Sequence, residues 1–134
     1  MFKKITIIAV VLSSLSLTGC VSTEQQKAAN DARNYIAANS PIKATSKEQC
    51  DLMWQRTQYF ITRNAGMKLQ IVTDTAIETY NADPNKMGVA TGSAIRLFSS
   101  KEACEIEPTI SYNLYGPQLD VIKTADMIKF IKQV

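Results

Sequence analysis

Residues 45–80, TSKEQCDLMWQRTQYFITRNAGMKLQIVTDTAIETY, decide the fold, because the spacing of the side chains suited to burial changes near the middle of this stretch. In the first half they recur every three or four residues along one helical face, which predicts an amphipathic helix. The residues on that face are Cys50, Met53, Trp54, Thr57 and Ile61. Over residues 67–80 the period changes to two and β-branched residues are frequent, which predicts a strand. Such a strand is unusually long, so we expect a bend or bulge near Asp74.

Both ends of the predicted helix carry local signals. Thr45 and Glu48, and likewise Ser46 and Gln49, have the spacing of a capping box, which marks a helix start. The helix should stop at residues 64–66, where Gly66 can adopt the left-handed conformation that often follows a helix.

Three further elements are expected on the C-terminal side. A second strand over residues 89–98 has Val89, Thr91, Ser93, Ile95 and Leu97 on one face. A third strand over residues 104–115 has Ile106, Pro108, Ile110, Tyr112 and Leu114 on one face. Because Pro108 has no N–H to donate, this strand should lie at an edge of the sheet, at least locally. A last helix is expected over residues 118–132.

Together these elements predict an α+β fold. We expect a two-layer sandwich in which a three-stranded antiparallel sheet is flanked by an N-terminal and a C-terminal helix, in the order α-β-β-β-α. The sheet would bury its apolar face under both helices. The length of the chain suits one such domain, which we place at residues 45–134.

Residues 20–44 are expected to form a tether, because Ala, Asn, Gln, Ser and Lys are frequent there. A short helix over residues 24–39 would have a thin apolar stripe, so we expect it to be frayed or weakly docked. The stripe consists of Ala29, Ala32 and Ile36. Ser40-Pro41 should end this helix, since a residue before proline disfavours the helical conformation.

The N-terminus has the layout of a secretory signal. Lys3 and Lys4 precede an uncharged, mostly apolar run of 13 residues from Ile5 to Leu17. As a helix this run would span about 20 Å, which is too short for the roughly 30 Å hydrocarbon core of a bilayer. A basic start, a short apolar region and small residues at its end are typical of a signal for secretion.

The apolar run ends in Leu17, Thr18, Gly19 and Cys20, a quartet that resembles the lipobox of bacterial lipoproteins. The resemblance implies that signal peptidase II recognises Leu17, Thr18 and Gly19 and cuts before Cys20, so that residues 1–19 are a signal peptide. It also implies a covalent diacylglycerol and an N-acyl chain on Cys20, and we expect no other cofactor. An ordinary secretory signal cut near Cys20 is the alternative.

The same resemblance predicts where the protein is located. Two or more acyl chains give stable anchoring to a membrane. In Gram-negative lipoproteins an Asp after the cysteine favours retention in the inner membrane, whereas Val21 and Ser22 follow here. We therefore expect a protein anchored to the periplasmic face of the outer membrane. Its partners would include the membrane itself and the lipoprotein maturation and sorting machinery.

The cysteine count predicts a disulfide. If Cys20 is lipidated, Cys50 and Cys104 remain as an even pair in an oxidising compartment. Their bond would close a loop of 55 residues, for which the chain-entropy model gives about 4 kcal/mol of stabilisation. Two buried free thiols are the alternative. A metal or catalytic role is not expected, because the chain has no histidine.

Composition excludes several classes of function. Without residues 1–19 the chain has 13 basic and 12 acidic residues, whereas nucleic-acid binders typically have a strongly basic face. The lack of histidine excludes Ser-His-Asp and Cys-His catalysis and histidine metal sites. Asp74 with Glu78, and Glu105 with Glu107, share predicted strand faces. Such carboxylate pairs can do acid–base work or bind Ca²⁺, but they are also typical of a solvated face.

These observations favour a non-enzymatic binding or structural module with an envelope protein or the cell wall as its partner, and with neither nucleic acid nor a metal. A partner strand could add at the edge beside Pro108. The alternatives are a small-ligand carrier, an unrecognised hydrolase or a protein similar to lysozyme inhibitors. A pocket under the helices would favour a carrier or a hydrolase.

Overall fold

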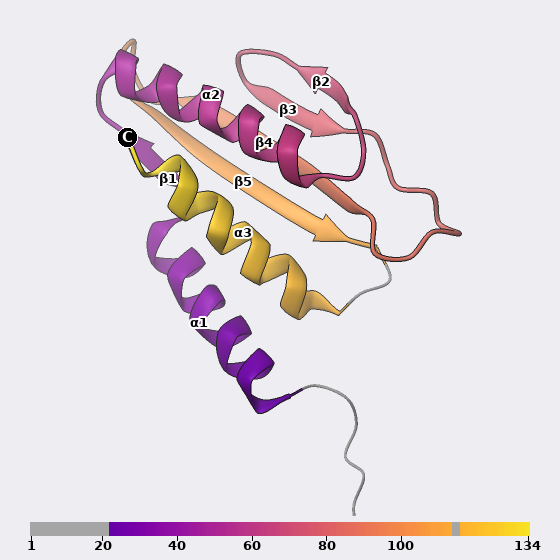
Figure 1. The fold of residues 1–134 in the computed structure, drawn as a ribbon. Helices are drawn as coiled ribbons and strands as arrows, with labels where there is room; N and C mark the ends of the chain where they lie inside the picture. Colours follow the sequence, from indigo (N-terminus) through magenta and orange to yellow (C-terminus); the bar gives the residue numbers. More distant parts are fainter. Residues whose placement is uncertain (1–21, 114–115) are drawn as a thin grey trace, which may run out of the picture.

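The computed structural model of the chain describes residues 22–113 and 116–134. Within those residues it has three helices and one five-stranded antiparallel sheet with the strand order β1-β5-β4-β3-β2 (Figure 1). In chain order the elements are α1 (Thr23–Asn39), β1 (Ile42–Ala44), α2 (Lys47–Asn64), β2 (Leu69–Val72), β3 (Ala76–Thr79), β4 (Ala90–Phe98), β5 (Cys104–Tyr112) and α3 (Pro117–Ile131).

The fold is α+β, but the prediction of a three-stranded sheet flanked by two helices is wrong. One reason is that the long strand expected over residues 67–80 is a hairpin of β2 and β3. Thr73 Oγ1 accepts hydrogen bonds from the backbone N–H groups of Thr75 (3.2 Å) and Ala76 (2.9 Å). These bonds close a tight turn around Asp74, so the expected bend is a complete reversal of the chain.

The second reason is strand β1, which no pattern in the sequence predicts. It pairs with the first residues of β5, with Ile42 opposite Ile106 and Ala44 opposite Cys104. Ile42 and Ala44 are buried and Lys43 is exposed. Three residues are too few for an alternating pattern to be recognised in a sequence.

The prediction that Pro108 lies at a local edge is confirmed. Strand β1 begins opposite Ile106, so Pro108 lies just beyond the part of β5 that pairs with β1. Farther along this edge, the N–H groups of Ile110 and Tyr112 donate to Thr124 Oγ1 (3.1 Å) and Asp120 Oδ1 (2.7 Å) of α3. Side chains of α3 therefore occupy the hydrogen-bonding groups that an added strand would need.

Helices α2 and α3 cover one face of the sheet, and α1 packs on the side of α3 away from α2 (Figure 1). Ala29 and Ala32 of α1 are buried, and Lys132 after α3 donates to Asn39 at the end of α1. Helix α1 is thus packed from Ala29 to its end, whereas residues 23–28 are exposed. This packing differs from the expected weak docking, because small side chains allow a close approach. The largest fully buried side chains of the core include Ile42, Ile61, Ile77, Ile106, Ile110, Met127, Ile128 and Ile131.

The ends of α2 follow the predicted signals only in part. Ser46 Oγ accepts from the N–H of Gln49 (3.2 Å), as a capping box requires, and Gln49 Oε1 accepts from the N–H of Thr45 (3.2 Å). Gly66 does not take the left-handed conformation. Its N–H donates to the carbonyl of Ala90 (2.8 Å), so the close approach to β4 is what favours a glycine there.

Strand β4 buries the face opposite to the one expected. Ala90, Gly92, Ala94 and Arg96 face the helices, whereas the side of Ile95 and Leu97 is open. A Cβ atom on Gly92 would lie 2.8 Å from Ile61 Cγ2, inside van der Waals contact. Helix α2 therefore passes so close to β4 at Gly92 that a larger side chain does not fit there.

Candidate functional site

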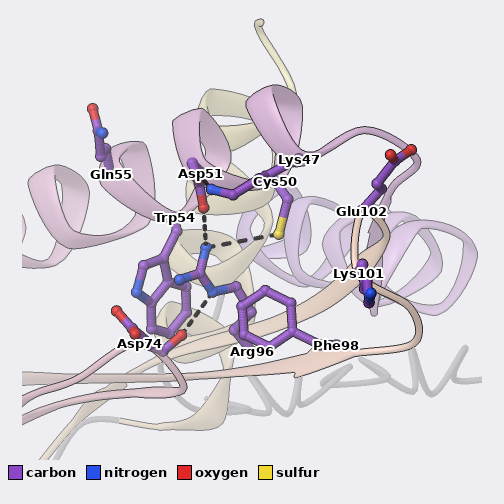
Figure 2. Close-up of a pocket in the computed structure, with 10 residues that line it drawn as sticks. All are labelled: Lys47, Cys50, Asp51, Trp54, Gln55, Asp74, Arg96, Phe98, Lys101 and Glu102. Atoms are coloured by element: carbon purple, nitrogen blue, oxygen red, sulfur yellow. Dashed lines mark hydrogen bonds and ion pairs between the residues drawn. The ribbon is translucent and has the colours of Figure 1, made fainter.

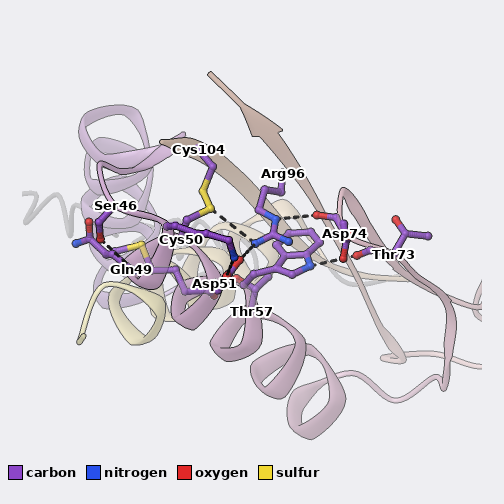
Figure 3. A network of polar contacts seen from close by, with 12 residues as sticks. Ser46, Gln49, Cys50, Asp51, Thr57, Thr73, Asp74, Arg96 and Cys104 are labelled. Carbon is purple, nitrogen blue, oxygen red and sulfur yellow. Dashed lines mark hydrogen bonds and ion pairs between the residues drawn. A yellow bond between two sulfur atoms is a disulfide. The ribbon is translucent and has the colours of Figure 1, made fainter. Parts of the chain in front are cut away.

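A disulfide joins α2 to the start of β5. Cys50 and Cys104 are each 1% exposed, and their Cα atoms are 6.0 Å apart. This bond confirms the pairing that the cysteine count predicts (Figure 3). Because Cys104 lies opposite Phe98 in the sheet, the disulfide also holds α2 over the end of β4.

Beside the disulfide lies a buried cation, Arg96, on the covered face of β4. Only 5% of its side chain is exposed. Nε donates to the carbonyl of Asp74 (2.7 Å), and Nη1 donates to Asp51 Oδ1 (3.1 Å) and to Cys50 Sγ (3.7 Å) (Figure 3). A buried charge is tolerated when it is paired and hydrogen-bonded, and Arg96 meets both conditions.

Two aromatic rings enclose the guanidinium of Arg96. Its Cζ atom lies 4.9 Å from the centroid of the Trp54 ring and 4.7 Å from that of Phe98. Both distances are within the roughly 6 Å over which cation–π attraction acts. Trp54 is itself fixed, because its Nε1 donates to the carbonyl of Thr73 (3.1 Å). Groups from α2, the β2–β3 turn and β4 therefore hold the guanidinium in one orientation.

Asp51 lies between Arg96 and a second cation, Lys47. Its Oδ2 is 2.6 Å from Lys47 Nζ, and its side chain is 41% exposed. The hydrogen bond from Lys47, supported by the charges of Lys47 and Arg96, lowers the pKa of Asp51 below its usual value against the opposing effect of burial. Asp51 is therefore ionised at neutral pH and poorly suited to donate a proton.

These side chains form part of a cavity of about 510 Å³ (Figure 2). We call it the Arg96 cavity. Its lining comes from α2, the β2–β3 turn, the end of β4 and the β4–β5 turn. The lining residues are Lys47, Cys50, Asp51, Trp54, Gln55, Asp74, Arg96, Phe98, Lys101 and Glu102. Three basic and three acidic side chains are among them, so the lining has no formal net charge.

One nitrogen of the Arg96 guanidinium is left for a ligand. Nη2 has no hydrogen bond to any protein atom in the described part of the chain. In that part of the chain, every fully buried side-chain nitrogen or oxygen has a hydrogen-bond partner. Nη2 has none, so it is not enclosed in the core. Figure 2 shows the guanidinium near the middle of the lining residues, with Lys101 and Glu102 on one side and Gln55 on the other.

The residues expected to specify the lipid anchor, Leu17, Thr18, Gly19 and Cys20, lie outside the described residues. Cleavage before Cys20 and its lipidation therefore stay predictions.

The structure separates one of the two carboxylate pairs. Asp74 is in the β2–β3 turn at the Arg96 cavity, whereas Glu78 is on the exposed face of β3. Glu105 and Glu107 do share a face of β5, and it is the face that the helices leave open. Neither pair is enclosed in the core.

Sequence reasoning missed Arg96, the central residue of the cavity. The available signal was its position, since it follows Ala90, Gly92 and Ala94 at a spacing of two. A face of small residues is where a helix can pass close to a sheet. An arginine on that face must be buried and must find partners, which the sequence alone does not name.

Three further results bear on the function. Across residues 22–113 and 116–134, no group of three or more His, Cys, Asp or Glu side chains is arranged to hold a metal ion. No helix in the same residues combines the length and the apolar composition needed to cross a bilayer. Comparison with protein-family models, curated proteins and solved structures finds no match.

Proposed function

We propose that the chain is a lipid-anchored envelope protein whose α+β domain binds a ligand in the Arg96 cavity without converting it. The anchor would be Cys20, and the location the periplasmic face of the outer membrane. The sequence around Cys20 supports the anchor, because it resembles a lipobox. The Cys50–Cys104 disulfide supports an oxidising compartment, where such bonds persist.

The observation that carries the binding proposal is the fixed guanidinium of Arg96. Small-ligand sites typically combine apolar walls with a few fixed polar groups. Here Trp54 and Phe98 are the walls and Arg96 Nη2 is the fixed donor. Because the guanidinium is already ordered by its other bonds, a ligand would lose little free energy in ordering it.

The same geometry suggests which ligand groups fit. An anionic or hydrogen-bond-accepting group would bond to Arg96 Nη2, and an apolar group would lie against Phe98. Lys101 and Glu102 on the β4–β5 turn would contact the parts of the ligand that stay near solvent.

The ionised state of Asp51 favours binding over catalysis. A general acid needs a raised pKa, whereas the pKa of Asp51 is lowered. The chain has no histidine to act as a base near neutral pH. Lys47 Nζ and Arg96 Nη1 already hold Asp51, so Arg96 Nη2 remains as a donor for binding.

Intact-mass analysis of protein purified from membranes tests the anchor. The expected mass is that of residues 20–134 plus a diacylglycerol and an N-acyl chain. A Cys20→Ser variant should be neither lipidated nor membrane-bound. An unmodified Cys20 or an uncleaved leader in the native protein would contradict the anchor.

Ligand binding can be followed through Trp54, because it is the only tryptophan of the chain. The probes are N-acetyl-alanyl-alanine, its C-terminal amide and inorganic phosphate. A probe with an anionic group should change the Trp54 fluorescence saturably, and the uncharged amide should bind at least about tenfold more weakly. An Arg96→Lys variant should lose this preference, whereas Lys27→Gln on the distant helix α1 should keep it. No saturable change with any probe at millimolar concentration would contradict the site.

A further inference from the structure

The face of the sheet away from the helices has two large aliphatic side chains at its centre. Ile95 and Leu97 lie on β4, the middle strand, and each is 64% exposed. Ile71 of β2 shares this face, since it lies opposite Glu78, and it is 38% exposed. In the described part of the chain no helix or loop covers these residues. We call this surface the open face.

Carboxylates border the aliphatic pair. Ile95 lies opposite Glu107, and Leu97 lies opposite Glu105, both on β5. The only basic residue at a strand position of the open face is Lys43 of β1, whose Nζ is 4.0 Å from Glu105 Oε1. With Glu78 on β3, the strand positions of this face have three carboxylates and one ammonium group.

The fold does not account for the exposure of Ile95 and Leu97. The core is formed on the other face, where α2 passes over Gly92 and its small neighbours. Polar β-branched residues would serve the strand equally well and would not expose apolar area to water. Adjacent exposed aliphatics with a polar rim are instead typical of a surface that another protein covers.

The carboxylates around Ile95 and Leu97 indicate what kind of partner fits the open face. A second copy of this chain would bring its own three carboxylates against these, and such like-charge contacts are unfavourable. A bilayer would have to receive the carboxylates next to its apolar interior, which is costly. Strand addition beside Pro108 is opposed, because Thr124 and Asp120 already occupy that edge.

We propose that the open face is the docking surface for a different protein, one that presents an apolar patch flanked by Lys or Arg side chains. Ile95 and Leu97 would be buried at the centre of this interface, and Glu105 and Glu107 would pair with the basic residues of the partner at its rim. The proposal does not depend on the Arg96 cavity, which lies on the other side of β4.

The test is in-cell photo-crosslinking with the full chain. A benzoylphenylalanine replaces Leu97 on the open face or, as the control, Tyr59, which is 56% exposed on α2. We expect a discrete product with another protein from position 97 and not from position 59. Glu105→Lys combined with Glu107→Lys should lower its yield at least about fivefold, because the basic rim would then be repelled. Glu48→Lys on α2 should leave the yield unchanged.

The charge-reversed chain must show the wild-type circular dichroism spectrum and urea midpoint, so that a lower yield reports on docking. A product of twice the chain mass would show a homodimer and overturn the proposal. Three other results would also overturn it. They are crosslinking to lipid, no product from position 97, and a yield that is unchanged by the charge reversal.

Discussion

Strand β4 presents two different surfaces. On its covered face, the small residues 90, 92 and 94 lie under α2, and the cation Arg96 follows them, 5% exposed between the rings of Trp54 and Phe98. On its open face, Ile95 and Leu97 are each 64% exposed. The charge is thus buried and the aliphatic groups are in water. This difference shows that side-chain volume and available partners, and not polarity alone, determine which face of β4 is buried.

The largest effect on the covered face should come from its disulfide. Cys50→Ala combined with Cys104→Ala should lower the free energy of unfolding by about 2–5 kcal/mol, because the unfolded chain regains the freedom of a long loop. Urea unfolding followed by Trp54 fluorescence measures it. A loss well under about 1 kcal/mol would show that the bond does not stabilise the covered end of β4.

Arg96→Met should lower the free energy of unfolding by about 2–4 kcal/mol. It removes the cation from between the rings and leaves the carbonyl of Asp74 without its donor. Ile95→Met, the neighbouring position on the open face, is the matched control and should change the value by less than about 0.5 kcal/mol. Equal effects at the two positions would remove the distinction between the faces.

Gly92→Ala and Ser93→Ala compare the same new side chain on the two faces. The first should cost about 1–3 kcal/mol, because its Cβ would lie 2.8 Å from Ile61 Cγ2. The second should stay within about 0.5 kcal/mol of wild type. If Gly92→Ala proves neutral in urea unfolding, α2 does not pack on β4 as closely as described.

The dependence of stability on pH should reflect Asp51. Its pKa is lowered in the folded state, so its stabilising contribution is fully present above about pH 4, the usual value of the unfolded chain, and is lost as the pH falls further. The difference in unfolding free energy between wild type and Asp51→Asn should therefore be constant between pH 5 and 8 and should shrink below about pH 4. A difference that shrinks already above pH 5 would contradict the pairing with Lys47 and Arg96.

Much of the fold could be predicted from local patterns. Helix α2 (Lys47–Asn64) and the last helix follow from spacing. The disulfide follows from the cysteine count, and the edge position of Pro108 follows from the missing N–H of proline. The strand at residues 42–44 could not be found, because three residues show no period. The hairpin at Asp74 was only half recognised, since nothing in the alternation marks where a chain reverses.

The Arg96 cavity could not be predicted, and the reason is distance along the chain. Arg96 is buried because Asp51, 45 residues earlier, supplies a carboxylate and Trp54 supplies a ring. The assignment of the β4 face failed for a related reason. It assumed that the larger aliphatics face the core, whereas the close packing of Ile61 on Gly92 leaves room only for a small residue at that position of the covered face.

The free energy of unfolding of Ile95→Thr combined with Leu97→Thr tests most directly whether the open face is kept apolar for a reason other than folding. Threonine is β-branched, which suits a strand, and it removes most of the aliphatic surface. We predict a value within about 1 kcal/mol of wild type. A loss of more than about 2 kcal/mol would contradict the account, because it would show that these side chains stabilise the fold itself.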